Sequence, residues 1–369
     1  MTPTTTTTTK TMKALVFFGA KDIRIEDRPF PQIQEPTDAI VKITAACLCG
    51  SDLHPYRGST SPKPGYIMGH ESISEVVSVG SAVKTVKPGD EVIAVFTTQC
   101  GHCFYCDRGL SSKCDQSVVF GTSALDGFQA EYARVPLADA TLKLKPEGIP
   151  DLKLVLMCDI FPTAFFGVKN LLNKFEPEQR TDLVELQMGC GPVGLLAIII
   201  AKALGVKTVF AVDYVTERLK LAEKFGAIPI NLKTEDVDAV LKKATDGRGP
   251  DGVLEVVGSK DALDTAFKVV RYGGVINSIG YQHSDLPFTG LDCYLKNIIL
   301  QFGRCPAASL FDESLEVFKK VQGLLDGFVD LELPLSSAVE GYELFDKQGA
   351  RKLIFRPHDL TEPVHHEHK

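Results

Sequence analysis

LVELQMGCGPVG, residues 183–194, is the stretch that decides the fold of this chain. Its apolar first half predicts a strand, and the residues that follow predict a helix over 195–204. Gly189, Gly191 and Gly194 lie between the two at G-x-G-x-x-G spacing, which is typical of a dinucleotide-binding turn. The first two glycines permit a tight turn against a pyrophosphate at the helix N-terminus. The third permits close packing of helix on strand.

Further residues are candidates for contacts with the same dinucleotide. Pro192 and Val193 complete the turn, and Asp213 ends the next predicted strand, 22 residues after the second glycine. A carboxylate at this position accepts hydrogen bonds from the adenosine ribose and repels a 2′-phosphate, so NAD is favoured over NADP. Arg218 and Gly280 are additional candidates. The competing interpretation is a glycine-rich turn that binds no nucleotide.

One feature of the predicted strand disagrees with this interpretation. Glu185 and Gln187 alternate within it, whereas a parallel strand buried on both faces is expected to be continuously apolar. A polar neighbour is the only explanation that the sequence offers.

Strands and helices alternate around this motif. Strands are expected at 208–212, 253–257 and 275–279, and helices at 164–175 and 217–224. Such alternation predicts an α/β domain with a parallel, doubly wound sheet of the Rossmann type.

The rest of the chain has a different pattern. Past Arg304 it becomes irregular and ends in a strand at 352–355. Short strands broken by Gly and Pro are expected near the N-terminus, at 14–18, 39–45, 72–79, 90–96 and 130–135. A β-rich region on both sides of an α/β block predicts one discontinuous domain.

The expected domain limits follow from these patterns. The Thr-rich residues 1–11 are expected to be a disordered leader. Residues 12–161 and 305–369 are expected to form the discontinuous β-rich catalytic domain, and residues 162–304 the cofactor domain. Two domains agree with a length of 369 residues, at roughly 150 residues per domain.

Composition excludes several classes of partner. The net charge is −7 and the isoelectric point about 5.7, so no nucleic-acid or anionic membrane partner is expected. No signal peptide or membrane-length apolar segment is seen, which favours a cytoplasmic protein whose cysteines stay reduced.

Four of the ten cysteines crowd into one loop. They stand at C-x2-C-x2-C-x7-C spacing: Cys100, Cys103, Cys106 and Cys114. Four thiolates close a tetrahedral shell around zinc with no open position, which is typical of a structural site. Disulfides and an iron–sulfur cluster are the alternatives.

Two short clusters precede this loop. They read Cys49-Gly50-Ser51-Asp52-Leu53-His54 and Gly69-His70-Glu71. Taken in order with the four-cysteine loop and the glycine motif, they closely resemble the zinc-containing medium-chain alcohol dehydrogenases. The resemblance runs from about residue 12 to 357. It implies a GroES-like catalytic domain and a Rossmann cofactor domain.

The resemblance also implies the ligands of a catalytic zinc. Cys49 and His70 are implied ligands, Asp52 orients His70, and Glu71 is a carboxylate able to approach the metal. The third ligand departs from the best-known members, which carry a cysteine there. The segment Met157-Cys158-Asp159-Ile160-Phe161-Pro162-Thr163 resembles the formaldehyde dehydrogenase-like branch, in which aspartate takes that place. Asp159 is therefore preferred over Cys158.

Other roles rest on the same resemblance. It implies a proton relay from Ser51 through the cofactor ribose to His54. It implies cofactor contacts by Thr163, Arg304 and Arg351, although the two arginines are equally compatible with surface salt bridges. An aromatic substrate pocket is expected from Phe96, Tyr56 and Phe120, which are also ordinary core residues.

The expected activity is hydride transfer between a nicotinamide cofactor and an alcohol, aldehyde or ketone whose oxygen binds the catalytic zinc. The resemblance implies two zinc ions per subunit and a homodimer or homotetramer. Alternatives are a reductase of enones or of secondary metabolites on the same fold, a zinc-stabilised interaction or nucleic-acid module, and a cofactor-binding protein without catalysis. The ligand set disfavours the enone reductase, and the acidic balance disfavours the nucleic-acid module.

Overall fold

The structure, a computed structural model, describes residues 10–358 and 360–367. Its contacts divide into two compact units. The first unit contains the described residues up to Asp159, together with Ala307–Ser309 and those from Leu325 onward. The second unit contains Ile160–Pro306 and Leu310–Leu324. Most of the predicted leader, residues 1–9, lies outside the described residues.

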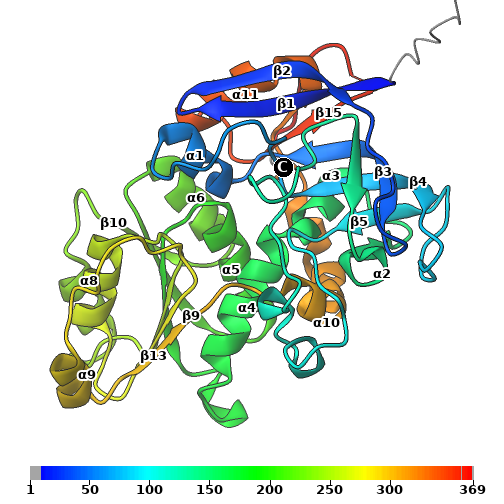
Figure 1. Cartoon of the computed structure of the whole chain (residues 1–369). Coiled ribbons are helices and arrows are strands. Elements are labelled where there is room, and N and C mark those ends of the chain that lie inside the picture. Colours follow the sequence, from blue (N-terminus) through cyan, green and yellow to red (C-terminus); the bar gives the residue numbers. More distant parts are fainter. Residues whose placement is uncertain (1–9, 359, 368–369) are drawn as a thin grey trace, which may run out of the picture. The chain divides into compact units, whose positions relative to one another are not determined.

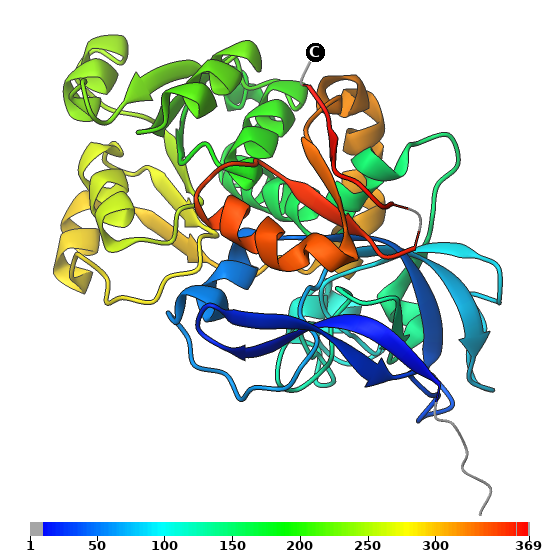
Figure 2. The ribbon, with the colours of Figure 1, turned by 90° about the horizontal axis from the view of Figure 1, so that it is seen from above.

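The first unit is rich in β-structure. Antiparallel β1 and β2 form a separate two-stranded sheet, shown in dark blue in Figure 2. A larger sheet follows the order β16-β14-β15-β3-β4-β5-β7, with β6 paired to β3. The strands are β1 (Thr11–Gly19), β2 (Asp22–Pro29), β3 (Ala39–Cys47), β4 (Ser72–Val79), β5 (Glu91–Ala94), β6 (Tyr132–Val135), β7 (Leu142–Leu144), β14 (Leu331–Pro334), β15 (Leu353–Arg356) and β16 (Val364–His365). The helices are α1 (Leu53–Arg57), α2 (Ala138–Thr141), α3 (Asp151–Leu154) and α11 (Ala338–Asp346).

The ordered chain begins slightly earlier than predicted. β1 starts at Thr11, so this residue belongs to a strand and not to the leader. The carbonyl of Lys10 accepts a hydrogen bond from the N–H of Phe30 at 2.8 Å, and the Lys10 ammonium lies 4.0 Å from the Phe30 ring centroid. Contacts with Phe30, which directly follows the paired strand β2, hold these residues in place. The local composition of the Thr-rich segment does not reveal this pairing.

The second unit is built on a six-stranded parallel sheet in the order β10-β9-β8-β11-β12-β13. This is the doubly wound arrangement, and the strand order reverses between β8 and β11. Figure 1 labels β9, β10 and β13 within it. The strands are β8 (Val184–Met188), β9 (Thr208–Asp213), β10 (Ile228–Asn231), β11 (Gly252–Glu255), β12 (Val275–Ser278) and β13 (Ile299–Phe302). The helices are α4 (Ile160–Leu172), α5 (Pro192–Ala203), α6 (Thr216–Lys224), α7 (Val237–Ala244), α8 (Lys260–Val269), α9 (Gly290–Lys296) and α10 (Ala307–Val321).

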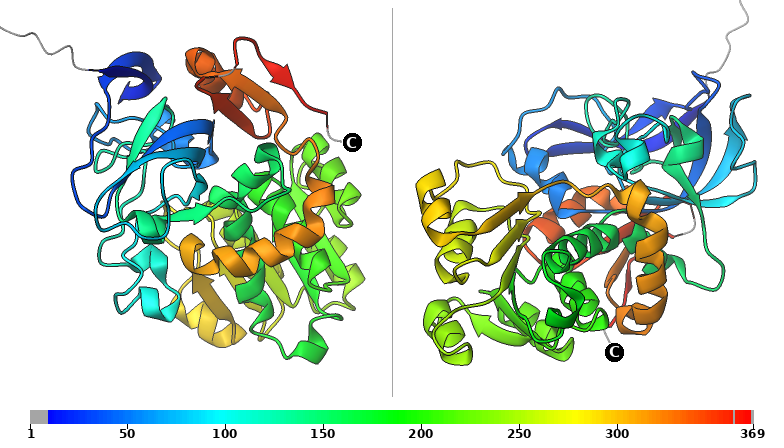
Figure 3. Two further views of the ribbon diagram at one scale, coloured as in Figure 1. Left: turned by 90° about the vertical axis from the view of Figure 1, so that its right-hand side faces the viewer. Right: turned by 90° about the horizontal axis from the view of Figure 1, so that it is seen from below.

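The prediction of irregular chain past Arg304 is wrong. α10 occupies 15 residues there, and α11 follows later in the chain. Phe311, Val317 and Phe318 lie on the buried face of α10, and Phe318 packs on Phe161 of α4 with ring centroids 4.9 Å apart. Figure 3 shows α10 in orange beside the green α4. This packing explains why 310–324 clusters with the second unit, whereas the predicted limits assign the segment to the catalytic domain.

The two polar residues of β8 are both fully buried. Gln187 has the polar neighbour that the sequence leaves open, because its Nε2 donates to the carbonyl of Gly189 at 3.0 Å and so braces the glycine turn. Glu185 differs, because neither of its carboxylate oxygens has a hydrogen-bond partner among the described residues. Burial raises the pKa of Glu185 to about 8. The carboxyl group therefore stays protonated in the fold at neutral pH.

This burial predicts a loss of stability as the pH rises. Between pH 4.5 and about 8 the folded chain keeps the proton of Glu185 and the unfolded chain has lost it, so the free energy of unfolding falls with pH. A shift of this size corresponds to on the order of 4–5 kcal/mol. We expect Glu185→Gln to remove most of this fall, as measured by urea unfolding between pH 5 and 9. The exposed Glu223→Gln on α6 is the control, and identical pH slopes for both variants would contradict the expectation.

Within residues 10–358 and 360–367, no helix has both the length and the apolar character needed to span a membrane.

Candidate metal centres and dinucleotide site

The structure brings four side chains of the first unit together. Cys49, His70, Glu71 and Asp159 each place a ligand atom within 4.8 Å of all the others. The Asp159 Oδ2 lies 3.5 Å from His70 Nε2 and 3.9 Å from Cys49 Sγ. Sulfur, imidazole nitrogen and carboxylate oxygen are all donors that zinc accepts, so the residues fit a zinc ion.

Local structure explains how the ligands are presented. Cys49 precedes a 3-10 turn, Gly50–Asp52, and donates its backbone N–H to Asp52 Oδ2 at 2.9 Å. The other oxygen of Asp52 faces His70 Nδ1 at 3.1 Å. Asp52 thus caps the turn and also directs His70 Nε2 toward the cluster, which is how an outer carboxylate orients a metal-ligating histidine.

Electrostatics favour a cation in this cluster. Burial opposes protonation of His70, but attraction to Asp52 and hydrogen bonds to Asp159, Asp52 and Cys49 outweigh it. The pKa of His70 is therefore raised well above 6.5. Because a metal ion replaces the proton at Nε2, the same carboxylates that attract a proton also attract Zn²⁺.

The cluster contains Asp159 and not Cys158. Asp159 directly follows a 3-10 turn, Val155–Cys158, that keeps the side chain of Cys158 in the interior. The Cys158 thiol is within hydrogen-bonding distance of the backbone carbonyl of Ser72, at 3.3 Å, and burial raises its pKa well above 9.0. Of the two alternatives that the sequence leaves open, this geometry favours Asp159.

Lys352 lies directly behind the cluster and belongs to no sequence motif. Its ammonium donates a hydrogen bond to Glu71 Oε2, and both side chains are buried, at 1% and 0% exposure. Burial lowers the pKa of Lys352, but its electrostatic interactions with Cys47, Glu71 and Cys49 and its hydrogen bond to Glu71 outweigh this effect and raise the pKa above 10.5. The other oxygen of Glu71 has no hydrogen-bond partner among the described residues. In the sequence, Lys352 is marked only by its position, as a lysine directly before the largely apolar strand β15.

The predicted relay and pocket residues occupy different environments. Ser51 Oγ lies 3.2 Å from His70 Nε2, and His54 is half-buried on α1. Phe96 is buried with its ring centroid 6.5 Å from that of His70. Tyr56 and Phe120, by contrast, pack in hydrophobic cores, against Tyr342 and Phe128 respectively. Both side chains are core residues in this structure, which is the alternative to a place in the substrate pocket.

The four cysteines of the loop form a second cluster. Cys100, Cys103, Cys106 and Cys114 also hold their sulfur atoms within 4.8 Å of one another. Cys100 Sγ and Cys114 Sγ are 3.6 Å apart. Tetrahedral coordination with Zn–S bonds of about 2.3 Å places sulfurs roughly 3.8 Å apart, so the loop fits zinc. Backbone N–H groups of Cys106 and Asp115 lower the pKa of Cys103 to about 6, whereas burial raises that of Cys106 to about 12.

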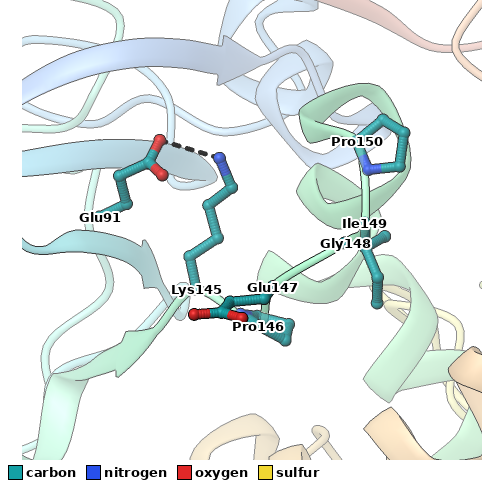
Figure 4. A pocket seen from close by; sticks show the side chains of 7 residues that line it. All are labelled: Glu91, Lys145, Pro146, Glu147, Gly148, Ile149 and Pro150. Atoms are coloured by element: carbon teal, nitrogen blue, oxygen red, sulfur yellow. Dashed lines mark hydrogen bonds and ion pairs between the residues drawn. The ribbon is translucent and has the colours of Figure 1, made fainter.

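A separate pocket of about 370 Å³ in the first unit is lined by Glu91 and residues 145–150. Figure 4 shows its ion pair between Lys145 and Glu91. None of the predicted site residues lines it.

The glycine motif has the geometry of a dinucleotide turn. Gly189 has φ +92°, and a Cβ on Gly194 would lie 2.0 Å from the Gly189 carbonyl oxygen, so both positions require glycine. A Cβ on Gly191 would meet nothing within 4 Å. Pro192 and Val193 form the first turn of α5 directly after it. Open space at a helix N-terminus fits a pyrophosphate.

Asp213 is tied to this turn. Its carboxylate accepts hydrogen bonds from the N–H groups of Cys190 at 2.9 Å, Tyr214 at 2.7 Å and Val215 at 2.9 Å. Arg218 Nη1 lies 3.8 Å from the same carboxylate. Asp213 therefore shapes the turn, a role that its spacing alone does not reveal.

The remaining cofactor candidates are scattered. Thr163 is half-buried in the first turn of α4, and Arg304 follows β13. Arg351 belongs to the first unit, where its guanidinium lies 5.7 Å from the Phe328 ring centroid and 3.9 Å from Asp330. These contacts match the salt-bridge alternative for Arg351. Gly280 touches the backbone of Gly258 at the carboxyl edge of the parallel sheet.

Two zinc-type clusters and a dinucleotide turn in one chain define a class of protein, the zinc-dependent oxidoreductases. Comparison with known proteins gives the family. Residues 35–146 match the alcohol dehydrogenase GroES-like domain, and residues 192–319 match the zinc-binding dehydrogenase domain.

Individual relatives agree with these matches. Zinc-type alcohol dehydrogenase B of Aspergillus flavus is 47% identical over 347 residues, which cover 94% of this chain and 81% of that protein. The medium chain reductase/dehydrogenase ucsI of an Acremonium species is 49% identical over 286 residues, covering 77% of this chain and 98% of that protein. The solved alcohol dehydrogenase TADH of Thermus sp. ATN1 is 32% identical, with a TM-score of 0.85, covering 94% of this chain and 99% of its own.

The chain therefore belongs to the zinc-containing medium-chain alcohol dehydrogenase family, and it is a zinc-dependent oxidoreductase. Both the GroES-like and the Rossmann-like parts of the predicted fold are confirmed.

Proposed function

We propose that this enzyme interconverts an alcohol and its aldehyde or ketone with NAD as the cofactor, using a zinc ion held by Cys49, His70 and Asp159. The observation that carries this proposal is the convergence of these three side chains, with Asp52 behind His70. When bound, zinc supplies Lewis-acid polarisation of the alcohol or carbonyl oxygen, and the nicotinamide accepts or donates hydride. The four-cysteine loop holds a second, structural zinc.

The chain's own residues supply the proton path and the wall of the pocket. The hydroxyl of Ser51, 3.2 Å from His70 Nε2, accepts the alcohol proton and donates its own to the cofactor ribose, and His54 takes the proton from the ribose and exchanges it with solvent. Phe96 provides an apolar wall near His70, which favours aliphatic or aromatic alcohols over polyols. Asp159 as third ligand supports the formaldehyde dehydrogenase-like branch. NAD is favoured by the charge of Asp213, although Arg218 stands close to it.

The test is a scan of NADH and NADPH oxidation against saturated aldehydes, ketones and enones. We expect reduction of saturated aldehydes, with NADH preferred. Activity on enones alone would contradict the proposed function, because reduction of a conjugated double bond requires none of the three ligands. A preference for NADPH would overturn only the cofactor assignment.

We further propose a homo-oligomer, with one contact through α9 and β13 (Figure 1). β13 is an edge strand of the sheet in the described chain, and Tyr294 and Leu295 on α9 are 78% and 65% exposed. Exposed apolar side chains next to an open strand edge fit a second copy of the same surface. This contact between two copies gives a dimer. A tetramer would require a second, different contact.

We expect Leu295→Asp to shift the protein toward the monomer, because the contact would bury an uncompensated charge. Sedimentation velocity measures the change. Leu144→Asp, at an exposed position of β7 in the first unit, is the matched control and leaves the oligomer intact. Equal behaviour of the two variants would contradict this interface.

The cytoplasm is the proposed location. All ten cysteines are free thiols in the structure, and a reducing compartment keeps those of the loop available to zinc. Fluorescence imaging of the tagged full chain tests this, and a signal confined to a secretory compartment would contradict it.

A further inference from the structure

Glu255, the last residue of β11, has a buried carboxylate that no motif marks. It is 0% exposed. Its Oε1 accepts hydrogen bonds from the backbone N–H groups of Val257 at 2.7 Å and Gly258 at 2.8 Å. Its Oε2 accepts from Ser278 Oγ at 2.7 Å and Gln282 Nε2 at 3.2 Å. One side chain therefore joins the loop after β11 to the loop after β12.

The backbones of these loops are in direct contact. A Cβ on Gly280 would lie 2.2 Å from the nitrogen of Gly258, and one on Gly258 would lie 2.6 Å from the nitrogen of Tyr281. A Cβ on Gly189, in the dinucleotide turn, would lie 2.6 Å from Val257 Cγ2. Three loops thus meet at the carboxyl edge of the sheet, and Glu255 is hydrogen-bonded to two of them.

Sheet topology indicates which part of a dinucleotide these loops face. A dinucleotide lies across the carboxyl ends of the strands where the order reverses, here between β8 and β11. Asp213 at the end of β9 marks the adenosine side. The loops after β11 and β12 lie on the other side of the reversal, and they present the exposed apolar side chains Val257 and Tyr281, at 52% and 63% exposure. An apolar surface of this kind suits the flat nicotinamide ring.

We propose that Glu255 is a positioning residue for the nicotinamide half of the cofactor, because it fixes residues 256–258 and 279–282 as one surface. This inference rests on the proposed nicotinamide-dependent function. Glu255 acts through the two loops and not by touching the cofactor. In Glu255→Gln, an NH2 group replaces one of the two carboxylate oxygens. At least one of the four groups that donate hydrogen bonds to Glu255 then loses its acceptor.

The test compares two ligands on the full-length zinc-loaded enzyme. NADH binding is followed by the fluorescence of the nicotinamide, since the chain has no Trp, and ADP-ribose, which lacks the nicotinamide, is measured by calorimetry. We expect Glu255→Gln to weaken NADH binding ten- to hundredfold and to change ADP-ribose binding less than threefold. The KM for NADH should rise more than kcat falls.

A milder variant covers the case in which Glu255→Gln does not fold. Gln282→Ala removes only the contact to the second loop and should weaken NADH binding about three- to tenfold, again with ADP-ribose binding unchanged. Equal weakening of both ligands would show a general structural role and overturn the inference, as would unchanged NADH binding in both variants. Failure of the unsubstituted enzyme to bind any nicotinamide dinucleotide would instead refute the proposed function.

Discussion

Asp159→Asn is expected to remove one of two zinc ions per chain and to lower alcohol oxidation at least about a hundredfold. The physical reason is the loss of a charged oxygen from the proposed ligand set, which lies 3.5 Å from His70 Nε2 and 3.9 Å from Cys49 Sγ. Substituting even the outer partners of metal ligands typically costs about 10- to 100-fold in affinity or activity, so loss of a direct ligand should cost at least as much. Zinc is measured by mass spectrometry of the purified protein.

Cys158→Ala is the matched control for this variant. It changes the neighbouring residue, whose buried thiol faces the carbonyl of Ser72 and lies outside the cluster. Two zinc ions and near-normal kcat are expected. If Cys158→Ala lost the metal and Asp159→Asn kept it, the third ligand would be the cysteine. Binding of NADH should stay nearly intact in both variants, because the dinucleotide turn belongs to the second unit.

Lys352→Met is expected to destabilise the first unit by about 3–5 kcal/mol, the usual cost of breaking a buried ion pair from one side. The substitution leaves the carboxylate of Glu71, which is 0% exposed, without its counter-charge. The double variant Glu71→Gln/Lys352→Met removes both charges and should recover more than half of the loss. Urea unfolding of the zinc-loaded protein provides the measurement.

An exposed ion pair provides the comparison. Lys87 and Asp90 are joined at 2.8 Å, with the lysine side chain 80% exposed. Lys87→Met should change the free energy of unfolding by less than about 1 kcal/mol, since water screens the pair. Equal effects of Lys87→Met and Lys352→Met would show that burial of the Glu71 pair carries no special cost.

The predictable features of this protein are those whose signal is local. The spacing of four cysteines within one loop, and three glycines between a strand and a helix, place their groups through short stretches of chain. The β-rich and α/β parts follow from periodicity for the same reason. The sequence leaves the third ligand open, because residues 158 and 159 both offer a ligand atom. Only the folded turn shows that the Cys158 side chain points into the interior, away from the cluster.

Features that depend on distant contacts stay hidden in the sequence. Lys352 and Glu71 are 281 positions apart, so no spacing links them. The sequence of α10 does not indicate a helix clearly, because Ser and acidic residues interrupt apolar residues that recur at helical intervals. The position of Phe120 also depends on distant contacts: the resemblance suggests a substrate pocket, and the fold buries the ring against Phe128.

Anomalous X-ray diffraction from crystals of the zinc-loaded protein, recorded on both sides of the zinc absorption edge, tests the central claim most directly. Two peaks per chain are expected, one among Cys100, Cys103, Cys106 and Cys114, and one within bonding distance of Cys49, His70 and Asp159. A single peak at the four-cysteine loop would contradict the account, because no metal would then be present where the alcohol must react.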